Sequence, residues 1–330
     1  MHFLLIGIGS IGERHIKNLK ELGIDISVFD SGIDIFRPNV SLPGQTFQLS
    51  ILDNIIQKYD VKFANPDTYF NDYDAFIICT PPDSHLSYIV SGLQHYANVF
   101  VEKPISDKLE HLDWVVQTSR NKELIVQVGY QLRFHPGLRL VKKLLDEGRI
   151  GKLLSIRAEF GQYLPDWRPN KDYRKSYTAD LGIIADSSHE IDYVRWLVGD
   201  EVKQVSCFAD KLSPLEIDSE DTAEINLKFD NGVIGNIHVD MTNRFYTRWC
   251  KLIGTKSTLF FNYNVSALLL GENELIEFDV LDPYIEEMKD FIRCIENKEK
   301  PLVDASVGEK VLEIALAAKE SSKENKVIEL

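Results

Sequence analysis

The stretch His2-Phe-Leu-Leu-Ile-Gly7-Ile-Gly9-Ser-Ile-Gly12 decides the fold of the first part of the chain. It joins an apolar run, typical of a buried parallel strand, to an amphipathic segment over residues 11–22 that is typical of a helix. The first glycine permits a tight turn, the second lets a pyrophosphate approach the backbone, and the third lets the helix pack closely against the strand. The N-terminus of such a helix also attracts anions. We therefore expect a dinucleotide to contact Gly7, Gly9, Ser10, Ile11 and Gly12.

An acidic residue follows the second predicted strand, which covers residues 25–29. Asp30 lies about 20 residues beyond the glycine turn, which is the distance expected of a carboxylate that accepts hydrogen bonds from an adenosine ribose. A carboxylate at this position repels the 2′-phosphate of NADP, so the sequence favours NAD over NADP. The alternative for Asp30 is a solvated carboxylate at the end of a strand.

Short apolar runs alternate with amphipathic segments through the first 124 residues, and these runs cover 2–6, 25–29, 61–64, 75–79, 98–101 and 124–128. Because parallel strands with crossover helices produce this alternation, residues 1–124 are predicted to form an α/β Rossmann domain with a parallel sheet. Residues 125–330 carry longer strand-like runs, an Asn-Gly hairpin signal at 229–233 and two closing helices. They are predicted to form an α+β domain with a large, mostly antiparallel open sheet.

Composition excludes several classes of partner. The chain has 330 residues with 51 acidic and 37 basic side chains, which gives a formal net charge of -14. Nucleic acids and anionic membranes are bound through clustered Lys and Arg, so neither is an expected partner. No apolar run approaches the roughly 20 residues of a membrane helix, and the four cysteines lack the spacing of a metal site or a redox dithiol. We expect a soluble, cytoplasmic protein with reduced thiols and no metal.

Two further loops follow predicted strands, at the sheet edge where open α/β sheets bind ligands. The first is Cys79-Thr-Pro-Pro-Asp-Ser-His85, and the second ends the run Val99-Phe-Val-Glu-Lys-Pro104. A lysine beside the cofactor can exchange a proton with a substrate hydroxyl, although an exposed strand-end lysine is the alternative for Lys103. The expected cofactor contacts from these loops are Thr80, Pro81, His85 and Glu102.

The stretch Asp186-Ser-Ser-His-Glu-Ile-Asp192 precedes apolar residues at helical spacing. Ser187 and Glu190 form a capping-box pattern, which predicts that a helix begins at Ser187. His189 then lies in the first turn, where the helix dipole disfavours the imidazolium and leaves a neutral ring that can act as a general base. Asp186 would orient this ring or pair with Lys103. A histidine that bonds only to neighbouring aspartates is the alternative, and a metal set that also uses His85 is not expected.

Residues 162–177 mix aromatic rings with basic side chains, and from Asp166 to Tyr177 they carry a local surplus of positive charge. Aromatic rings can stack on a sugar or a base while arginine binds a phosphate. We therefore interpret this segment as a substrate loop, with a solvated surface loop as the alternative. Its expected substrate contacts are Tyr163, Trp167 and Arg174.

Four stretches together resemble the Gfo/Idh/MocA family of NAD(P)-dependent oxidoreductases: Gly7–Gly12, Thr80–Pro82, Glu102–Pro104 and Asp186–Asp192. The resemblance covers essentially the whole chain in domain order. It implies that Lys103 acts at the reacting hydroxyl, that the Glu102–Pro104 region contacts the nicotinamide end of the cofactor, and that Gln131 and Arg133 contact the substrate. For Arg133, an interdomain salt bridge is the alternative. Two departures from the family pattern are a shorter glycine run near Gly182 and a shorter spacing from Asp186 to His189.

The resemblance also implies a reaction. Family members oxidise or reduce a secondary alcohol on a sugar, inositol, sugar phosphate or nucleotide sugar, and they pair through the open face of the C-terminal sheet. We therefore expect an NAD-dependent dehydrogenase of an anionic sugar-like substrate, forming a homodimer or homotetramer through residues 125–330, and the loop at 162–177 resembles members of bacterial amino-sugar or nonulosonate biosynthesis. The alternatives are a non-catalytic NAD sensor and an elimination or glycosidase reaction that recycles NAD. The expected catalytic residues are Lys103, His189 and Asp186, and the expected substrate contacts are Lys103, Gln131, Arg133, Tyr163, Trp167, Arg174 and His189.

Overall fold

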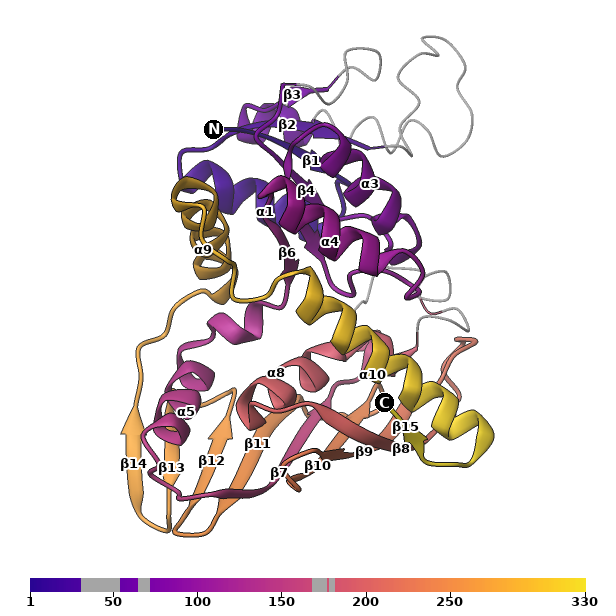
Figure 1. Cartoon of the computed structure of the whole chain (residues 1–330), viewed down its shortest axis with the longest axis vertical. Coiled ribbons are helices and arrows are strands. Elements are labelled where there is room, and N and C mark those ends of the chain that lie inside the picture. Colours follow the sequence, from indigo (N-terminus) through magenta and orange to yellow (C-terminus); the bar gives the residue numbers. More distant parts are fainter. Residues whose placement is uncertain (31–53, 65–71, 168–176, 178–181) are drawn as a thin grey trace. The chain divides into compact units, whose positions relative to one another are not determined.

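The computed structural model describes residues 1–30, 54–64, 72–167, 177 and 182–330 (Figure 1). These residues form two compact units. The first unit comprises Met1–Gly129 and Tyr284–Glu309, and the second comprises Tyr130–Pro283 and Lys310–Leu330. The chain therefore enters the second unit and later returns to the first, which a single boundary after residue 124 does not describe.

The first unit contains a parallel sheet with the strand order β3-β2-β1-β4-β5-β6. The strand order reverses between the neighbours β1 and β4, because β2 and β3 lie on one side of β1 while β4, β5 and β6 lie on the other. Ligands of such sheets usually bind at the carboxyl ends of the strands at this point. This is the predicted Rossmann architecture. The strands are β1 (His2–Ile6), β2 (Asp25–Phe29), β3 (Lys62–Phe63), β4 (Ala75–Ile78), β5 (Asn98–Glu102) and β6 (Val126–Gly129). The helices between them are α1 (Ser10–Glu21), α3 (Pro82–Gln94) and α4 (Leu112–Lys122).

Helix α9 (Pro283–Asn297) supplies core residues to this unit, although it follows the strands of the second unit in sequence. Its Phe291 is fully buried and makes edge-to-face contacts with Phe3 of β1 and Phe100 of β5, at ring centroid distances of 6.0 and 5.8 Å. Burial of a phenylalanine side chain stabilises a fold by about 1.5–3 kcal/mol. The first unit is therefore completed by a distant segment that the local alternation pattern does not reveal.

The second unit contains a sheet with the strand order β14-β13-β12-β11-β7-β10-β9-β8-β15. Its pairs are antiparallel except for β7 with β10, which confirms the predicted mostly antiparallel sheet. The strands are β7 (Leu153–Gly161), β8 (Val202–Asp210), β9 (Thr222–Phe229), β10 (Ile234–Asp240), β11 (Thr247–Gly254), β12 (Thr258–Asn262), β13 (Ala267–Leu270), β14 (Glu274–Glu277) and β15 (Ile328–Glu329). The other elements of this unit are η2 (Gln131–Phe134), α5 (Pro136–Asp146), α6 (Leu164–Trp167), α7 (Ile183–Asp186) and α8 (Ser188–Val198), while α10 (Ala305–Glu324) spans both units.

One face of the second sheet is apolar and packs against helices. Helix α8 packs against β7 and β10, and α5 packs against β12 and β13. Along β9, buried Ala223, Ile225 and Leu227 alternate with exposed Glu224 and Asn226 on the opposite face. The predicted hairpin between β9 and β10 is present, and Gly232 provides the positive φ of 84° that its turn requires.

Two features bear on the predicted environment of the chain. The four cysteines are free and buried, as expected for reduced core thiols. Among the helices in the described part of the chain, none combines the length and the apolar character needed to cross a bilayer.

Candidate functional site

The glycine turn between β1 and α1 has the shape of a phosphate-binding loop. Gly7 has a φ of 94°, and a Cβ atom there would lie 2.9 Å from the backbone of Cys79. A Cβ atom on Gly12 would lie 2.1 Å from the carbonyl oxygen of Gly7. In contrast, a Cβ atom on Gly9 would meet nothing within 4 Å, so space is open beside the N-terminus of α1. The turn thus fits the pyrophosphate of a dinucleotide, with Ser10 and Ile11 in the first turn of the helix.

Asp30 follows β2, as predicted, and lies at the rim of this turn. Its Oδ2 atom accepts a hydrogen bond of 2.8 Å from the backbone N–H of Ile8. This bond holds the second-strand carboxylate beside the glycine turn, where an adenosine ribose is expected. The predicted contact with the ribose remains a prediction, but the position of the side chain fits it.

His85 on α3 joins the two other loops at this edge. Its Nδ1 atom lies 2.8 Å from the carbonyl oxygen of Pro104 and its Nε2 atom lies 2.7 Å from that of Thr80. The side chain is fully buried, and burial lowers the pKa of His85 although the two carbonyls oppose this shift. These contacts favour a positioning role for His85 over the predicted direct contact with a cofactor.

The loop after β4 is also organised by Ser84. Its hydroxyl donates to the Thr80 Oγ1 atom over 2.7 Å, next to Pro81, the residue that precedes α3. Thr80 and Pro81 therefore have defined positions at the carboxyl end of β4. Their predicted contact with the cofactor remains a prediction.

The loop after β5 begins with Glu102, which is paired inside the first unit. Its Oε1 atom lies 2.7 Å from Nε2 of His15, a fully buried residue of α1. Glu102 thereby links the end of β5 to the helix that starts at the glycine turn. Lys103 follows, half-buried, before a cis peptide bond to Pro104. The structure thus places Lys103 at the same sheet edge as the glycine turn and the Thr80 loop, as the topology of the strands requires.

In the second unit, two buried ion pairs fix helix α8. Asp192 accepts a bidentate interaction from Arg133, with Nε–Oδ2 and Nη2–Oδ1 distances of 2.9 and 2.7 Å. Glu190 accepts from Nε of Arg248 on β11 over 2.9 Å. Asp192 and Glu190 are fully buried, so each pair replaces hydration that the carboxylate has lost. The first two turns of α8 are therefore held from two sides.

The pair with Asp192 gives Arg133 a structural role. Arg133 is 4% exposed, and its Nε and Nη2 atoms bond to a carboxylate of the same unit. Its predicted contact with the substrate remains a prediction. Gln131 lies in the same short helix η2 as Arg133 and is buried. Its predicted contact with the substrate remains a prediction.

The capping box predicted at Ser187 is absent. Helix α8 begins at Ser188, Ser187 makes no side-chain cap bond, and its N–H donates instead to the carbonyl of Ile183 in the preceding helix α7. Glu190 cannot close the box because its carboxylate bonds to Arg248. The N–H of Ser187 is thus satisfied by α7, and the N–H of Glu190 donates to the carbonyl of Ser187.

His189 lies in the first turn of α8, as predicted. It is 7% exposed, and its ring meets that of Tyr130 edge-to-face at a centroid distance of 5.5 Å. Asp186 ends α7 and its Oδ2 atom accepts a hydrogen bond of 2.6 Å from the hydroxyl of Tyr177. Tyr177 was not predicted as a site residue. It is the last residue of the aromatic and basic stretch, and its hydrogen bond to Asp186 is what singles it out.

The predicted substrate loop is described in part. Tyr163 is half-buried, and the guanidinium of Arg244 lies 3.5 Å from its ring centroid. Trp167 ends the short helix α6 and is 37% exposed. Arg174 lies outside the described residues. Within the described residues, no group of His, Cys, Asp and Glu side chains has the arrangement of a metal site.

Comparison with known proteins defines the class of the molecule. The first unit is an NAD(P)-binding Rossmann domain, because residues 1–130 match the oxidoreductase family with an NAD-binding Rossmann fold. Residues 138–260 match the Gfo/Idh/MocA C-terminal domain. The chain therefore belongs to the Gfo/Idh/MocA family of oxidoreductases, as the sequence motifs indicated.

Individual relatives have several activities. The myo-inositol 2-dehydrogenase of Thermotoga maritima is 27% identical over 351 aligned residues, which cover 100% of this chain and 98% of that protein. The 2,7-anhydro-N-acetylneuraminate hydratase of Mediterraneibacter gnavus is 30% identical over 142 residues, covering 42% of this chain and 38% of the relative. The WlbA dehydrogenase of Bordetella pertussis, solved with NADH and UDP-GlcNAcA, shares the fold with a TM-score of 0.80 and 21% identity, over 99% of this chain and 98% of that chain.

Proposed function

We propose that the protein is an NAD-dependent dehydrogenase of a secondary alcohol on an anionic sugar-like substrate. The observation that carries this proposal is the position of Lys103, which follows β5 at the ligand-binding edge of a Rossmann sheet whose glycine turn fits a dinucleotide. When bound there, NAD accepts or returns a hydride at carbon 4 of its nicotinamide.

The cofactor preference rests on Asp30. Its carboxylate is held at the rim of the glycine turn by the N–H of Ile8, where it can accept hydrogen bonds from ribose hydroxyls. A 2′-phosphate in that place would meet a fixed negative charge. We therefore expect NAD to bind more tightly than NADP.

Three side chains supply the proton chemistry of the proposed reaction. Lys103 takes the proton from the substrate hydroxyl during oxidation, and His189 is the second expected proton acceptor. Asp186 supports this proton transfer, and the hydrogen bond from Tyr177 fixes the position of its carboxylate. Such proton transfer contributes about 100-fold to 10,000-fold to the rate of an enzyme.

The substrate class and the assembly are supported by relatives and by surface chemistry. The relatives include an inositol dehydrogenase and a dehydrogenase solved with a nucleotide sugar. Inositol and the sugar of the nucleotide sugar both carry secondary alcohols on a ring. The exposed face of the second sheet carries alternating polar side chains along β9 and is the surface through which we expect two or four copies to associate.

The direct test measures NADH production on inositols, sugar phosphates and nucleotide sugars. With the best substrate, Lys103→Ala and His189→Ala are each expected to lower kcat by about 100-fold or more. Lys17→Ala is the matched control, since Lys17 lies on α1 and is largely exposed. Full activity in both Lys103→Ala and His189→Ala would refute the assigned roles.

A second function is favoured by one relative. The similarity to a hydratase over 142 residues supports a reaction in which bound NAD takes a hydride from the substrate and returns it within one turnover, so that a substituent is eliminated or added with no net redox change. This reaction requires the same proton-transferring residues but releases no NADH. Stoichiometric retention of NAD through purification, with substrate conversion and no net NADH, would identify it. Tight NAD binding without conversion of any substrate would instead identify a sensor.

A further inference from the structure

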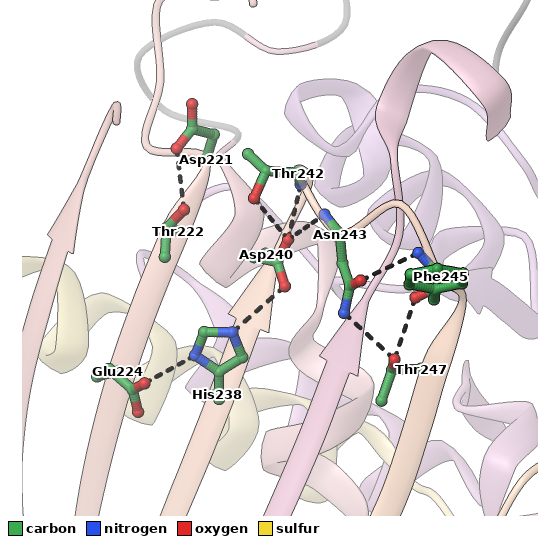
Figure 2. A network of polar contacts seen from close by, with 9 residues as sticks. All are labelled: Asp221, Thr222, Glu224, His238, Asp240, Thr242, Asn243, Phe245 and Thr247. Atoms are coloured by element: carbon green, nitrogen blue, oxygen red, sulfur yellow. Dashed lines mark hydrogen bonds and ion pairs between the residues drawn. The ribbon is translucent and has the colours of Figure 1, made fainter. Parts of the chain in front are cut away.

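Residues 241–246 connect β10 to β11 and form a loop whose backbone is held by hydrogen bonds to the side chains of Asp240 and Asn243 (Figure 2). Asp240 Oδ1 accepts hydrogen bonds from the N–H and the hydroxyl of Thr242, over 2.7 and 2.8 Å, and from the N–H of Asn243. Asn243 Oδ1 then accepts from the N–H of Phe245 over 3.0 Å, and its Nδ2 donates to Thr247. The backbone of this loop is thus fixed before any ligand arrives.

A charged histidine supports the anchor of the loop. His238 lies between Glu224 and Asp240, with ring nitrogen to carboxylate distances of 2.7 and 3.3 Å. The hydrogen bonds to Asp240 and Glu224 raise the pKa of His238 to about 9. Burial acts to raise the pKa of Asp240, but hydrogen bonds from His238 and Thr242 outweigh it and lower that pKa. Asp240 therefore stays ionised and accepts the hydrogen bonds from Thr242 and Asn243.

The same loop is attached to the start of the predicted substrate loop. The N–H groups of Gln162 and Leu164 donate to the carbonyls of Asp240 and Met241, over 3.1 and 2.9 Å. Gly161 makes this approach possible, because a Cβ atom there would lie 2.6 Å from Asp240 Oδ2. Tyr163 is consequently held against the 241–246 loop from the end of β7.

Arg244 belongs to this 241–246 loop. It is exposed, and its guanidinium lies 3.5 Å from the centroid of the Tyr163 ring. No ion pair involves Arg244 among the residues that the structure describes, in a chain whose net charge is -14. A guanidinium stacked on an aromatic ring keeps its in-plane N–H groups directed outward, in the fork that matches phosphate and carboxylate oxygens.

The location of Arg244 points to the substrate. The N–H of Met241 donates to the carbonyl of Asp221 over 2.8 Å, and the neighbouring Glu220 carbonyl accepts from the N–H of Ile183 at the start of α7. On the other side of the loop, Arg248 pairs with Glu190 of α8. The loop is therefore linked indirectly to the segments that carry Asp186 and His189, through residues 220–221 on one side and through Arg248 of β11 on the other, all within the second unit.

We propose that Arg244, stacked on Tyr163, is an oxyanion-binding site that takes the phosphate or carboxylate group of the substrate. This site rests on the proposed function, because it assigns substrate binding to the second unit. The site would explain why the protein prefers an anionic substrate. Arg244 would then be a specificity-determining residue that distinguishes anionic sugars from neutral polyols.

The test is isothermal titration calorimetry of the full chain saturated with NAD, using UDP, glucuronate and myo-inositol at constant ionic strength. UDP carries phosphoryl oxygens and glucuronate a carboxylate, so the two anionic probes distinguish the two sources of the oxyanion. Arg244→Ala is expected to lower the affinity for the more tightly bound anionic probe by about 10-fold or more, and to leave the affinity for myo-inositol unchanged. Arg244→Lys retains the charge without the planar fork. Its affinity for this probe is expected to lie between those of the unaltered protein and Arg244→Ala.

The matched control is Arg157→Ala, because Arg157 is an exposed arginine of β7 on the same sheet. The proposal is overturned when neither anionic probe binds the unaltered protein at millimolar concentration. It is equally overturned when Arg244→Ala weakens both probes by less than about threefold, or no more than Arg157→Ala does. The titration needs no turnover, so a failure of the proposed dehydrogenase activity appears separately, as a lack of NADH production from every sugar.

Discussion

The glycine turn of the first unit is shaped by backbone and by missing side chains, whereas the start of helix α8 in the second unit is held by ion pairs. At the glycine turn, space for a Cβ atom is absent at Gly7 and Gly12 and open at Gly9. At helix α8, buried carboxylates are fixed by Arg133 and Arg248. The comparison shows that the glycine turn depends on residues close in sequence, while helix α8 is positioned by side chains 58 and 59 residues away.

The largest expected effect follows from Gly12→Ala. The added Cβ atom would lie 2.1 Å from the carbonyl oxygen of Gly7, and backbone cannot yield as a flexible side chain does. We expect a loss of at least about 4 kcal/mol in the free energy of unfolding, together with loss of NAD binding. Thermal unfolding and fluorescence titration with NAD measure the two effects.

Gly9→Ala is the matched variant for this prediction. Gly9 has a φ of -80° and open space around its Cβ position, so the unfolding temperature should not change. NAD affinity should still fall, because the methyl group occupies the place where the pyrophosphate approaches the backbone. Unaltered stability of Gly12→Ala, or unaltered NAD affinity of Gly9→Ala, would contradict this account of the turn.

The next effect belongs to the ion pairs of the second unit. Asp192→Asn leaves the guanidinium of Arg133 buried without its counter-charge, which is expected to cost about 3–5 kcal/mol of unfolding free energy. The comparison is Glu274→Gln, which breaks a pair with Arg149 whose side chains are 53% and 41% exposed. That variant should lose less than about 1 kcal/mol. Equal losses in chemical denaturation would show that the buried pair has no special role.

A smaller effect is expected at His85, which combines features of both regions. It is a side chain, but it acts on backbone carbonyls of the Thr80 and Pro104 loops. Removing the imidazole leaves both carbonyls without their hydrogen-bond partner, which is expected to lower the free energy of unfolding by about 1–3 kcal/mol. His85→Ala should therefore lower stability and raise the KM for NAD.

The control for His85 directly follows the same helix. His95 follows the end of α3, where its Nδ1 atom lies 2.8 Å from the carbonyl of Ser91. His95→Ala should leave the KM for NAD unchanged because that bond is distant in sequence from both loops. A rise in KM in both variants would indicate general loosening of α3 instead of a positioning role for His85.

The same contrast between local and distant determinants explains what the sequence could predict. The parallel sheet, the glycine turn and the position of Asp30 follow from patterns within a few residues, and the structure has them where they were expected. The partners of Arg133, Arg248 and Glu102 lie 59, 58 and 87 residues away, respectively. No local pattern identifies such pairs, so the sequence could offer a salt bridge of Arg133 as an alternative but could not name its partner.

Competition between local and distant bonds also explains the missing capping box. The Ser187 and Glu190 pattern is sufficient for a cap in an isolated helix. Here Arg248 on a strand of the same sheet takes the Glu190 carboxylate, and α7 supplies a carbonyl to the N–H of Ser187. Tertiary ion pairing therefore overrides a correct local signal, at the helix that carries the predicted base His189.

The smallest expected effect is the pH dependence of the network that anchors the 241–246 loop. His238 faces Glu224 of β9, Asp240 of β10 and, in register on β7, Glu159. Its pKa is raised to about 9 by Asp240 and Glu224, above the ordinary value of about 6.5 for an unfolded chain. A raised pKa means that the stabilisation is fully present below about pH 6.5 and is lost as the pH rises through about 9.

Because the ring is partly exposed to solvent, we expect this contribution to be only about 1 kcal/mol. Unfolding free energies of the unaltered protein and of His238→Gln, measured from pH 6 to pH 10, should differ most at the acidic end and converge above about pH 9. A difference that is constant over this range would show that His238 stabilises the network by packing and not by charge. Convergence would link a charge on the open sheet face to the loop that presents Arg244.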